Sequence, residues 1–246
     1  MTDDSIVFGL HAVRALLKQR PDRAVRLIVQ KGREDARIAE VLKLAKNANV
    51  QIETRDVRDL DRLAGAERHQ GACLYAKPPG VLGEGALDDL LDGLSTPPFL
   101  LVLDGVQDPH NLGACLRTAD AVGVTAVVVP RDRAAGMSPI VRKVASGAAE
   151  VVPLIQVTNL ARTLKGLKDR NIWVVGTDDQ ADKSLYETDL KGPLAVVLGA
   201  EGPGLRRLTK ENCDALVTIP MHGIVESLNV SVATGVVLFE ALRQRR

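Results

Sequence analysis

Aromatic residues and long apolar runs are scarce in this sequence. Phe, Trp and Tyr together make up 2% of the 246 residues, so rows of rings that stack on single-stranded bases are not expected to provide recognition. No stretch approaches the roughly 20 consecutive apolar residues of a membrane-spanning helix. The first five residues, MTDDS, also lack the basic start of a secretory signal. We therefore expect a cytoplasmic protein.

Cysteine and excess charge are scarce as well. The three cysteines, Cys73, Cys115 and Cys213, form no Cys-x-x-Cys pair, so the sequence encodes neither a disulfide framework nor a zinc site, and no metal is expected. A net charge of +1 argues against indiscriminate coating of nucleic acid, because that mode needs a large excess of Lys and Arg. A local basic face remains compatible with this balance.

What the sequence does contain is an alternation of helix and strand patterns. In residues 1–76 the predicted elements are helices at 9–20, 33–47 and 56–63, and strands at 24–30, 50–54 and 72–76. This order predicts a small α/β domain. Residues 77–98 are rich in Pro, Gly and acidic residues, which we interpret as a linker that holds one short helix near 86–94.

Residues 99–246 carry continuous apolar runs separated by helical stretches. The runs read FLLVLD, VTAVVVP, EVVPLI, NIWVVGT, PLAVVLG and ALVTIP. Strands that are apolar on both faces indicate a parallel sheet covered by helices on each side. Because such sheets bind ligands at the carboxyl ends of their strands, we expect the chemistry in the loops after Leu103, Val175, Leu198 and Ile219.

The first motif, DGVQDPHNLGACLRT, begins at Asp104. Asn111 is expected to cap the following helix, and Gly113 to permit close approach of another backbone or of a ligand. Arg117 lies further into the helix, and its fork of donors suits phosphate or ribose oxygens. The segment alone is equally compatible with a capped helix that carries a surface arginine.

Two further motifs follow strands of the second domain. The first, LGAEGPGL, begins at Leu198 and places three glycines around Glu201, so its backbone groups could hydrogen-bond a nucleoside. It matches neither a Walker A loop nor a G-x-G-x-x-G fingerprint. The second contains SLNVSVATGVVLFEAL, in which Ser227 is expected to cap a long helix. Its core-facing side is predicted to consist of Leu228, Val232, Val236 and Phe239.

Together the three segments resemble motifs one, two and three of the SpoU (TrmH) family of RNA 2′-O-ribose methyltransferases, a branch of the SPOUT superfamily. The resemblance covers residues 99–246, and residues 1–75 resemble an L30-like RNA-binding domain. Strings such as VPLIQVTNLAR and NIWVVGT look most like members that methylate a guanosine of 23S ribosomal RNA. The resemblance implies S-adenosylmethionine as methyl donor, a parallel-sheet catalytic domain with a deep trefoil knot, and a homodimer whose active site draws on both subunits.

The resemblance also assigns roles to individual residues. The catalytic residues would be Asn111, Arg117, Glu201, Ser227 and Asn229, and backbone groups at Gly199, Ile219 and Leu228 would hold S-adenosylmethionine. Since arginine stays protonated in proteins, we expect Arg117 to act as a cation that lowers the pKa of the 2′-hydroxyl, with an RNA phosphate taking the proton. Glu226 departs from the small residue that many relatives have beside this motif.

Binding of RNA and of a second subunit is also expected. The candidate RNA-binding cations are Lys31, Arg33, Arg37, Arg131, Arg133, Arg142, Lys143, Arg206 and Arg207. Val230, Val237 and Leu238 exceed what one buried stripe of the last helix needs. This surplus must be covered by the rest of the chain or by a second subunit, and the resemblance favours a second subunit.

The sequence is also compatible with other functions. A nicotinamide-dependent oxidoreductase is disfavoured, because the first turn of the parallel sheet lacks the glycine triplet that a pyrophosphate needs. Methylation of tRNA or of another rRNA nucleotide stays open, as does a non-catalytic rRNA-binding protein.

Overall fold

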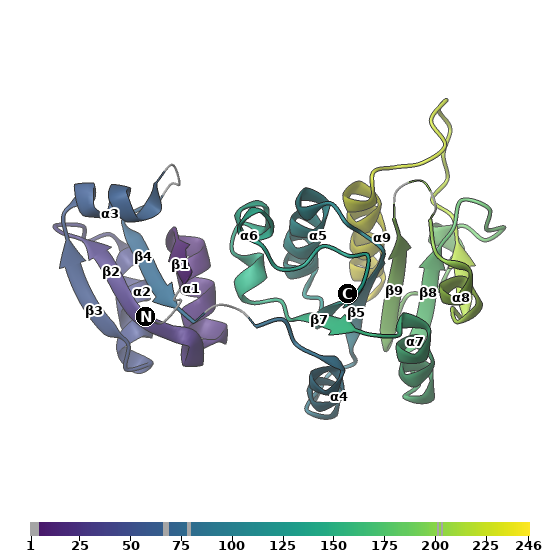
Figure 1. Ribbon diagram of the computed structural model, residues 1–246, viewed down its shortest axis with the longest axis horizontal. Helices are drawn as coiled ribbons and strands as arrows, with labels where there is room; N and C mark the ends of the chain where they lie inside the picture. The colour runs from purple at the N-terminus through teal and green to yellow at the C-terminus, as the bar shows by residue number, and fades with distance from the viewer. Residues whose placement is uncertain (1–4, 66–68, 78–79, 201, 203) are drawn as a thin grey trace. The chain divides into compact units, whose positions relative to one another are not determined.

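The computed structural model describes residues 5–65, 69–77, 80–200, 202 and 204–246. The chain divides into two compact units (Figure 1), the first made of Met1–Gly80 and Ser146–Val151 and the second of Val81–Ala145 and Val152–Arg246. Among the described residues, no helix combines the length and apolar content that a membrane crossing needs.

The first unit is a four-stranded mixed sheet with helices on both faces. Its strands are β1 (Ser5–Phe8), β2 (Ala24–Gln30), β3 (Gln51–Arg55) and β4 (Ala72–Ala76), and its helices are α1 (Leu10–Gln19), α2 (Ala36–Asn47), α3 (Val57–Ala64) and the short 3₁₀ turns η1 (Pro21–Arg23) and η2 (Ala148–Glu150). The strand order is β1-β4-β2-β3. Only β2 and β3 are parallel, and β4 runs antiparallel to both of its neighbours. The small α/β domain is confirmed, although β1 was not predicted.

The alternation of side chains along β2 explains why both faces of this sheet are covered. Leu27 and Val29 are buried in one cluster with residues of α1 and α2, whereas Ile28 belongs to a separate cluster with Leu60 of α3. Successive side chains of a strand point to opposite faces. A continuous apolar run therefore requires helices on both sides of the sheet.

A buried ion pair fastens Ser146–Val151 to the rest of the first unit. Arg23 Nη2 lies 2.6 Å from Glu150 Oε2, and the two side chains are only 7% and 6% exposed. The other guanidinium donors reach the backbone carbonyls of Glu150 and Lys77. Because every charged group in this pair has a partner, the pair tolerates its burial.

The second unit is a six-stranded sheet in which every pair is parallel. Its strands are β5 (Phe99–Asp104), β6 (Ala126–Pro130), β7 (Leu154–Val157), β8 (Trp173–Thr177), β9 (Leu194–Gly199) and β10 (Ala215–Val217). Its helices are α4 (Glu84–Asp92), α5 (Pro109–Val122), α6 (Pro139–Ala145), α7 (Leu160–Asp169), α8 (Arg207–Glu211), α9 (Val230–Gln244) and the 3₁₀ turn η3 (Leu185–Glu187). The predicted parallel sheet is confirmed. The expected trefoil knot stays a prediction.

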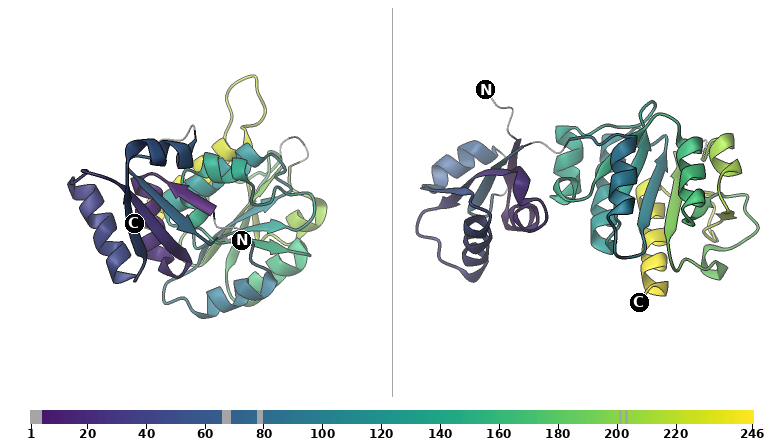
Figure 2. Two further views of the ribbon diagram at one scale, coloured as in Figure 1. Left: turned by 60° about the vertical axis from the view of Figure 1, so that its left-hand side comes forward. Right: turned by 90° about the horizontal axis from the view of Figure 1, so that it is seen from below.

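Helices cover both faces of this sheet, as its all-apolar strands require. The helix α5 packs against α6 and α9, and α9 contacts β9. On the other face, α7 packs against β8 and α8, and α4 packs against β7. Leu87 of α4 lies in the core, so the stretch interpreted as a linker contains a helix that packs on this unit. Figure 2 shows the units from two further directions, with α9 in yellow.

The strand order β10-β8-β9-β5-β6-β7 brings three strand ends together. The strands β8, β9 and β10 are neighbours although they are separated along the chain. The segment between β10 and α9 extends beyond the sheet at this end (Figures 1 and 2). This edge is where the sequence predicted the chemistry to lie.

Candidate active site

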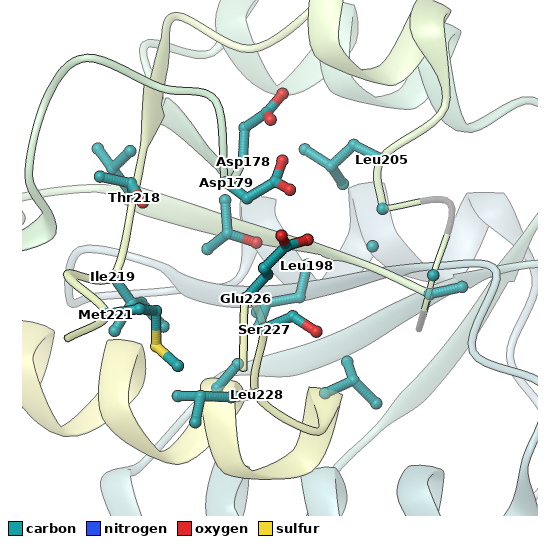
Figure 3. Close-up of a pocket in the computed structure, with 18 of the residues that line it drawn as sticks. Asp178, Asp179, Leu198, Leu205, Thr218, Ile219, Met221, Glu226, Ser227 and Leu228 are labelled. Atoms are coloured by element: carbon teal, nitrogen blue, oxygen red, sulfur yellow. The ribbon is translucent and has the colours of Figure 1, made fainter. Parts of the chain in front are cut away.

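A pocket of about 630 Å³ lies at the carboxyl ends of β8, β9 and β10 (Figure 3). Its described lining consists of residues 177–179, 198–200, 202, 204–205, 210, 217–221, 226–228, 230 and 233. Three of the four loops named from the sequence thus converge here, whereas the loop after β5 contributes no described lining residue. The volume falls in the range of roughly 300 to 1,000 Å³ that is usual for small-molecule sites.

Gly199 ends β9 at a point with no room for a side chain. A Cβ built on Gly199 would lie 2.1 Å from the carbonyl carbon of Gly204. The chain turns back on itself here, since the Gly204 N–H donates to the Ala200 carbonyl at 3.1 Å, and Gly204 has φ +63°, which favours glycine. The glycines of motif two therefore shape the pocket wall. Glu201 lies outside the described residues.

Asp104, at the end of β5, anchors the segment that follows this turn. Its side chain is completely buried and accepts from the backbone N–H of Arg206 at 3.0 Å and from Arg206 Nε at 2.6 Å. Asp104 was not predicted to have a role, and Arg206 was predicted to bind RNA. Arg206 holds the loop beside the pocket through this ion pair, and its contact with RNA stays a prediction. The position of Asp104 at the end of a buried strand was the signal that could have identified it.

An ion pair fixes a second wall of the pocket. Lys210 of α8 lies 2.5 Å from Asp178 Oδ2, and the Asp178 side chain is 6% exposed. Burial alone would raise the pKa of Asp178, but hydrogen bonds from Lys210 and from the Gln180 backbone outweigh it and hold that pKa below its usual value. Neither Asp178 nor Lys210 was predicted to belong to the site, so this ion pair was missed.

Motif three forms a further part of the pocket lining. Ile219, Ser227 and Leu228 all line it. Among the described residues, the backbone groups of Ile219 and Leu228 have no hydrogen-bond partner, so their donors and acceptors are available to a ligand. Ser227 is exposed and does not cap the helix. The cap of α9 is Asn229, whose Oδ1 accepts from the Ser231 N–H at 2.9 Å.

Asn111 and Asn229 come together although 118 residues separate them. Asn229 Nδ2 donates to Asn111 Oδ1 at 3.1 Å. The expectation that Asn111 caps its helix is wrong: the cap of α5 is Asp108, which accepts from the His110 N–H at 2.9 Å. Asn111 is therefore a helical residue, and it links the start of α5 to the start of α9 beside the pocket.

Arg117 is not brought to the pocket. It is exposed on α5 and is not among the described lining residues. Six residues of helix separate it from Asn111, which corresponds to about 9 Å along the axis and about 120° around it. Within the described part of the chain, its guanidinium makes no hydrogen bond or ion pair.

Gly113 and two of the other RNA-binding candidates have close neighbours within the chain. A Cβ on Gly113 would lie 2.9 Å from the carbonyl oxygen of Val141, so this glycine admits the backbone of α6 rather than a ligand. Of the cations assigned to RNA, Arg33 pairs with Asp35 and Arg207 with Glu211.

The two faces of α9 are the reverse of those predicted. Val230, Val237 and Leu238 are buried within the chain, whereas Val232 and Phe239 are 51% and 52% exposed. The assignment of Val237 and Leu238 to a dimer face was therefore wrong. The unpartnered apolar residues lie on the opposite side of the helix.

Both units match families of known proteins. The SpoU rRNA Methylase family matches residues 98–239, and the family described as RNA 2′-O ribose methyltransferase substrate binding matches residues 6–81. The 23S rRNA (guanosine-2′-O-)-methyltransferase RlmB of Shewanella oneidensis is 54% identical over 246 residues, 100% of both chains. RlmB of Pseudomonas aeruginosa is 56% identical over 239 residues, 97% of this chain and 96% of that one.

Solved structures share the whole fold. A crystal structure described as RNA 2′-O ribose methyltransferase gives a TM-score of 0.71 at 28% identity, covering 99% of this chain and 89% of that chain. The SpoU methyltransferase AviRb from Streptomyces viridochromogenes, solved with its cofactor AdoMet, gives a TM-score of 0.73 at 22% identity, covering 98% of this chain and 90% of that one. At this lower identity the likeness shows the fold alone.

Proposed function

Because the chain belongs to the SpoU rRNA methylase family, we propose that it transfers the methyl group of S-adenosylmethionine to the ribose 2′-hydroxyl of a guanosine in 23S ribosomal RNA. The observation that carries this function is identity of 54% with an RlmB over the full length of both chains. The pocket at the ends of β8, β9 and β10 supports the proposal, because its volume suits a small-molecule ligand. The enzyme acts in the cytoplasm, where its RNA substrate is made.

The residues of the pocket fit S-adenosylmethionine. The backbone groups of Ile219 and Leu228, which have no partner among the described residues, are suited to the polar edge of an adenine. The apolar side chains of Leu198, Met221 and Leu228 offer a surface for the flat face of the base. When bound, the donor supplies a methyl group on a positively charged sulfur.

Arg117 acts on the acceptor in this scheme. A guanidinium beside the ribose lowers the pKa of the 2′-hydroxyl without giving up its own proton, and an RNA phosphate receives the released proton. Asn111 and Asn229, joined by their hydrogen bond, together with Ser227 position the ribose. Glu201 is proposed to orient Arg117. Orientation of this kind can supply on the order of 7 to 11 kcal/mol of a displacement barrier.

A second subunit completes the site. We assign the dimer surface to the outer face of α9, where Val232, Val236 and Phe239 follow one another at helical spacing and Val232 and Phe239 are half exposed. The exposed Arg117 lies on α5, the helix that packs against α9. A partner docked on this surface can therefore bring its own Arg117 to the pocket of the first subunit, which one chain alone does not do.

The first unit binds the RNA. Support comes from its match to a substrate-binding family over residues 6–81. Its expected RNA contacts are the cations Lys31 and Arg37, for which the described residues offer no ion-pair partner.

The experiment that tests this function is transfer of tritiated methyl groups into 23S rRNA isolated from a strain that lacks the gene. We expect label in 23S rRNA at a single ribose 2′-oxygen of a guanosine, found by mapping 2′-O-methyl sites. Arg117→Ala protein, which should still bind S-adenosylmethionine, serves as the matched control. Label in tRNA alone, or none in any RNA, would contradict the proposal.

A further inference from the structure

We propose that Asp179 and Glu226 make the pocket selective for the charged methyl donor over its neutral product, S-adenosylhomocysteine. This inference rests on the proposed function, and it assigns to these two side chains a role in the exchange of donor and product. It concerns the cavity already described, and the carboxylates line that cavity from two different segments.

The charge of the pocket differs from that of the chain as a whole. The described lining contains three acidic side chains, Asp178, Asp179 and Glu226, and one lysine, Lys210, which gives a formal charge of −2. The whole chain has a net charge of +1. This small concave surface therefore carries a concentrated negative charge, and a cavity with walls of one sign focuses its field on a bound ligand.

Only one of the three acids is neutralised. Lys210 forms an ion pair with Asp178, whose side chain is nearly buried. Asp179 and Glu226 are exposed and have no ion pair with a lysine or arginine of the described residues. In the close-up of Figure 3 both carboxylates are drawn among the lining residues, in the same part of the view as Ser227. Their charge is therefore not offset by a cation of the described residues, and the Asp179 carboxylate lies beside that of Asp178.

The proposed reaction changes the charge of the ligand at one atom. The donor has a sulfonium, an ammonium and a carboxylate, and hence a net charge of +1. When the ribose oxygen displaces the methyl group, the carbon–oxygen bond forms, the carbon–sulfur pair stays on sulfur, and the product is a neutral thioether. The hydroxyl proton leaves to an RNA phosphate. An acidic pocket therefore attracts the donor more than the product, which favours release of the product after each turnover.

This attraction acts on binding rather than on the chemical step. The sulfonium loses charge in the transition state, so carboxylates stabilise the ground state at least as well as the transition state. Removing them should raise the KM for the donor without lowering kcat through a lost catalytic group. If these carboxylates instead positioned the ribose hydroxyls of the nucleoside, removing them would weaken binding of donor and product equally, because both ligands have those hydroxyls.

The test is titration calorimetry of the full-length protein with three ligands that share the same nucleoside and amino acid. S-adenosylmethionine carries a positive sulfur, sinefungin carries a positive amine at the equivalent place, and S-adenosylhomocysteine is neutral there. For Asp179→Asn and Glu226→Gln, we expect the preference for either cation over the neutral product to fall by about three- to tenfold each at low salt. Glu187→Gln removes an exposed charge outside the pocket and should leave the preference unchanged.

The outcomes separate this inference from the function on which it rests. Equal weakening of all three ligands would overturn the selectivity role and leave the methyltransferase function standing. The selectivity role would also be overturned if a variant that carries both Asp179→Asn and Glu226→Gln kept the parental preference for the cationic ligands over the neutral product. Failure of the parent protein to bind any of the three ligands would overturn the proposed function itself.

Discussion

Phe239 and Leu238 are adjacent residues of α9 with opposite surroundings. Leu238 is completely buried within the chain, whereas Phe239 is 52% exposed. Placing a charge at Phe239 should therefore disrupt the proposed dimer and leave the fold of the subunit intact. Truncating Leu238 should do the reverse.

The magnitude follows from the exposed area. A Phe side chain has roughly 150–250 Å² to bury, so a half-exposed ring leaves about 100 Å² per subunit, and a symmetric interface covers it twice. At about 25 cal/mol per Å², this burial contributes roughly 5 kcal/mol. Its loss raises the Kd of the dimer by roughly three to four orders of magnitude. Leu238→Ala should instead lower the free energy of unfolding by about 2–5 kcal/mol.

Sedimentation velocity across a concentration series, combined with the methyl-transfer assay, measures both effects. We expect Phe239→Asp to sediment as a monomer with a parental circular dichroism spectrum and to lose activity in proportion to its dissociation. Leu238→Ala should remain a dimer and unfold at lower urea concentration. A Phe239→Asp protein that stays dimeric at nanomolar concentration, or a parent that is active as a monomer, would refute the reasoning.

Three further predictions concern other parts of the chain. Arg117→Ala should abolish methyl transfer and leave calorimetric binding of S-adenosylmethionine within about threefold of the parent, since its proposed partner is the ribose; turnover near the parental rate would exclude that role. Arg23→Met should lower the free energy of unfolding in urea by about 3–5 kcal/mol, because Glu150 stays buried without its partner, and adding Glu150→Gln should recover part of the loss. Hydrogen bonds from Arg243 and Gln244 lower the pKa of Glu240 from 4.5 to about 2, so the stabilisation by Glu240 is present above pH 4.5 and is lost as the pH falls toward 2. In urea titrations, Glu240→Gln should make the free energy of unfolding less dependent on pH between 4.5 and 2. An unchanged pH dependence would contradict the assignment.

The strand bounds were predicted best for those strands whose position is determined by burial of an apolar run. The bounds of β2, β4 and β5 agree with the predicted 24–30, 72–76 and FLLVLD, because a continuous apolar run has few other ways to be buried. The strand β1 has only four residues, and it is held in the sheet by its pairing with β4, which lies at the other end of the unit in sequence. A contact of that separation leaves no periodic signal in so short a segment.

Helix starts were predicted less well, because several residues near each start can cap. Both Asp108 and Asn111 are good N-cap residues, and the structure uses Asp108. Pro109 directly after it was the available signal, since proline favours the first helical position. Ser227 and Asn229 compete in the same way, and Asn229 caps α9. The choice of cap residue thus places Asn111 inside α5 and leaves Ser227 in the segment before α9.

The orientation of α9 could not be predicted from periodicity, because its apolar residues surround the helix. The buried face includes Thr234 and Glu240, and Thr234 is satisfied by donating to the Val230 carbonyl at 2.7 Å. Polar residues therefore face inward while Val232 and Phe239 face outward, the opposite of what a helix on a monomer surface favours. Such an arrangement is stable only if the inward-facing polar groups are paired, as they are. It is explained most simply if another surface covers the outward-facing apolar side chains. Since Arg117 is exposed and is not among the described residues that line the pocket of its own chain, one docking event would cover that surface and supply the proposed cation.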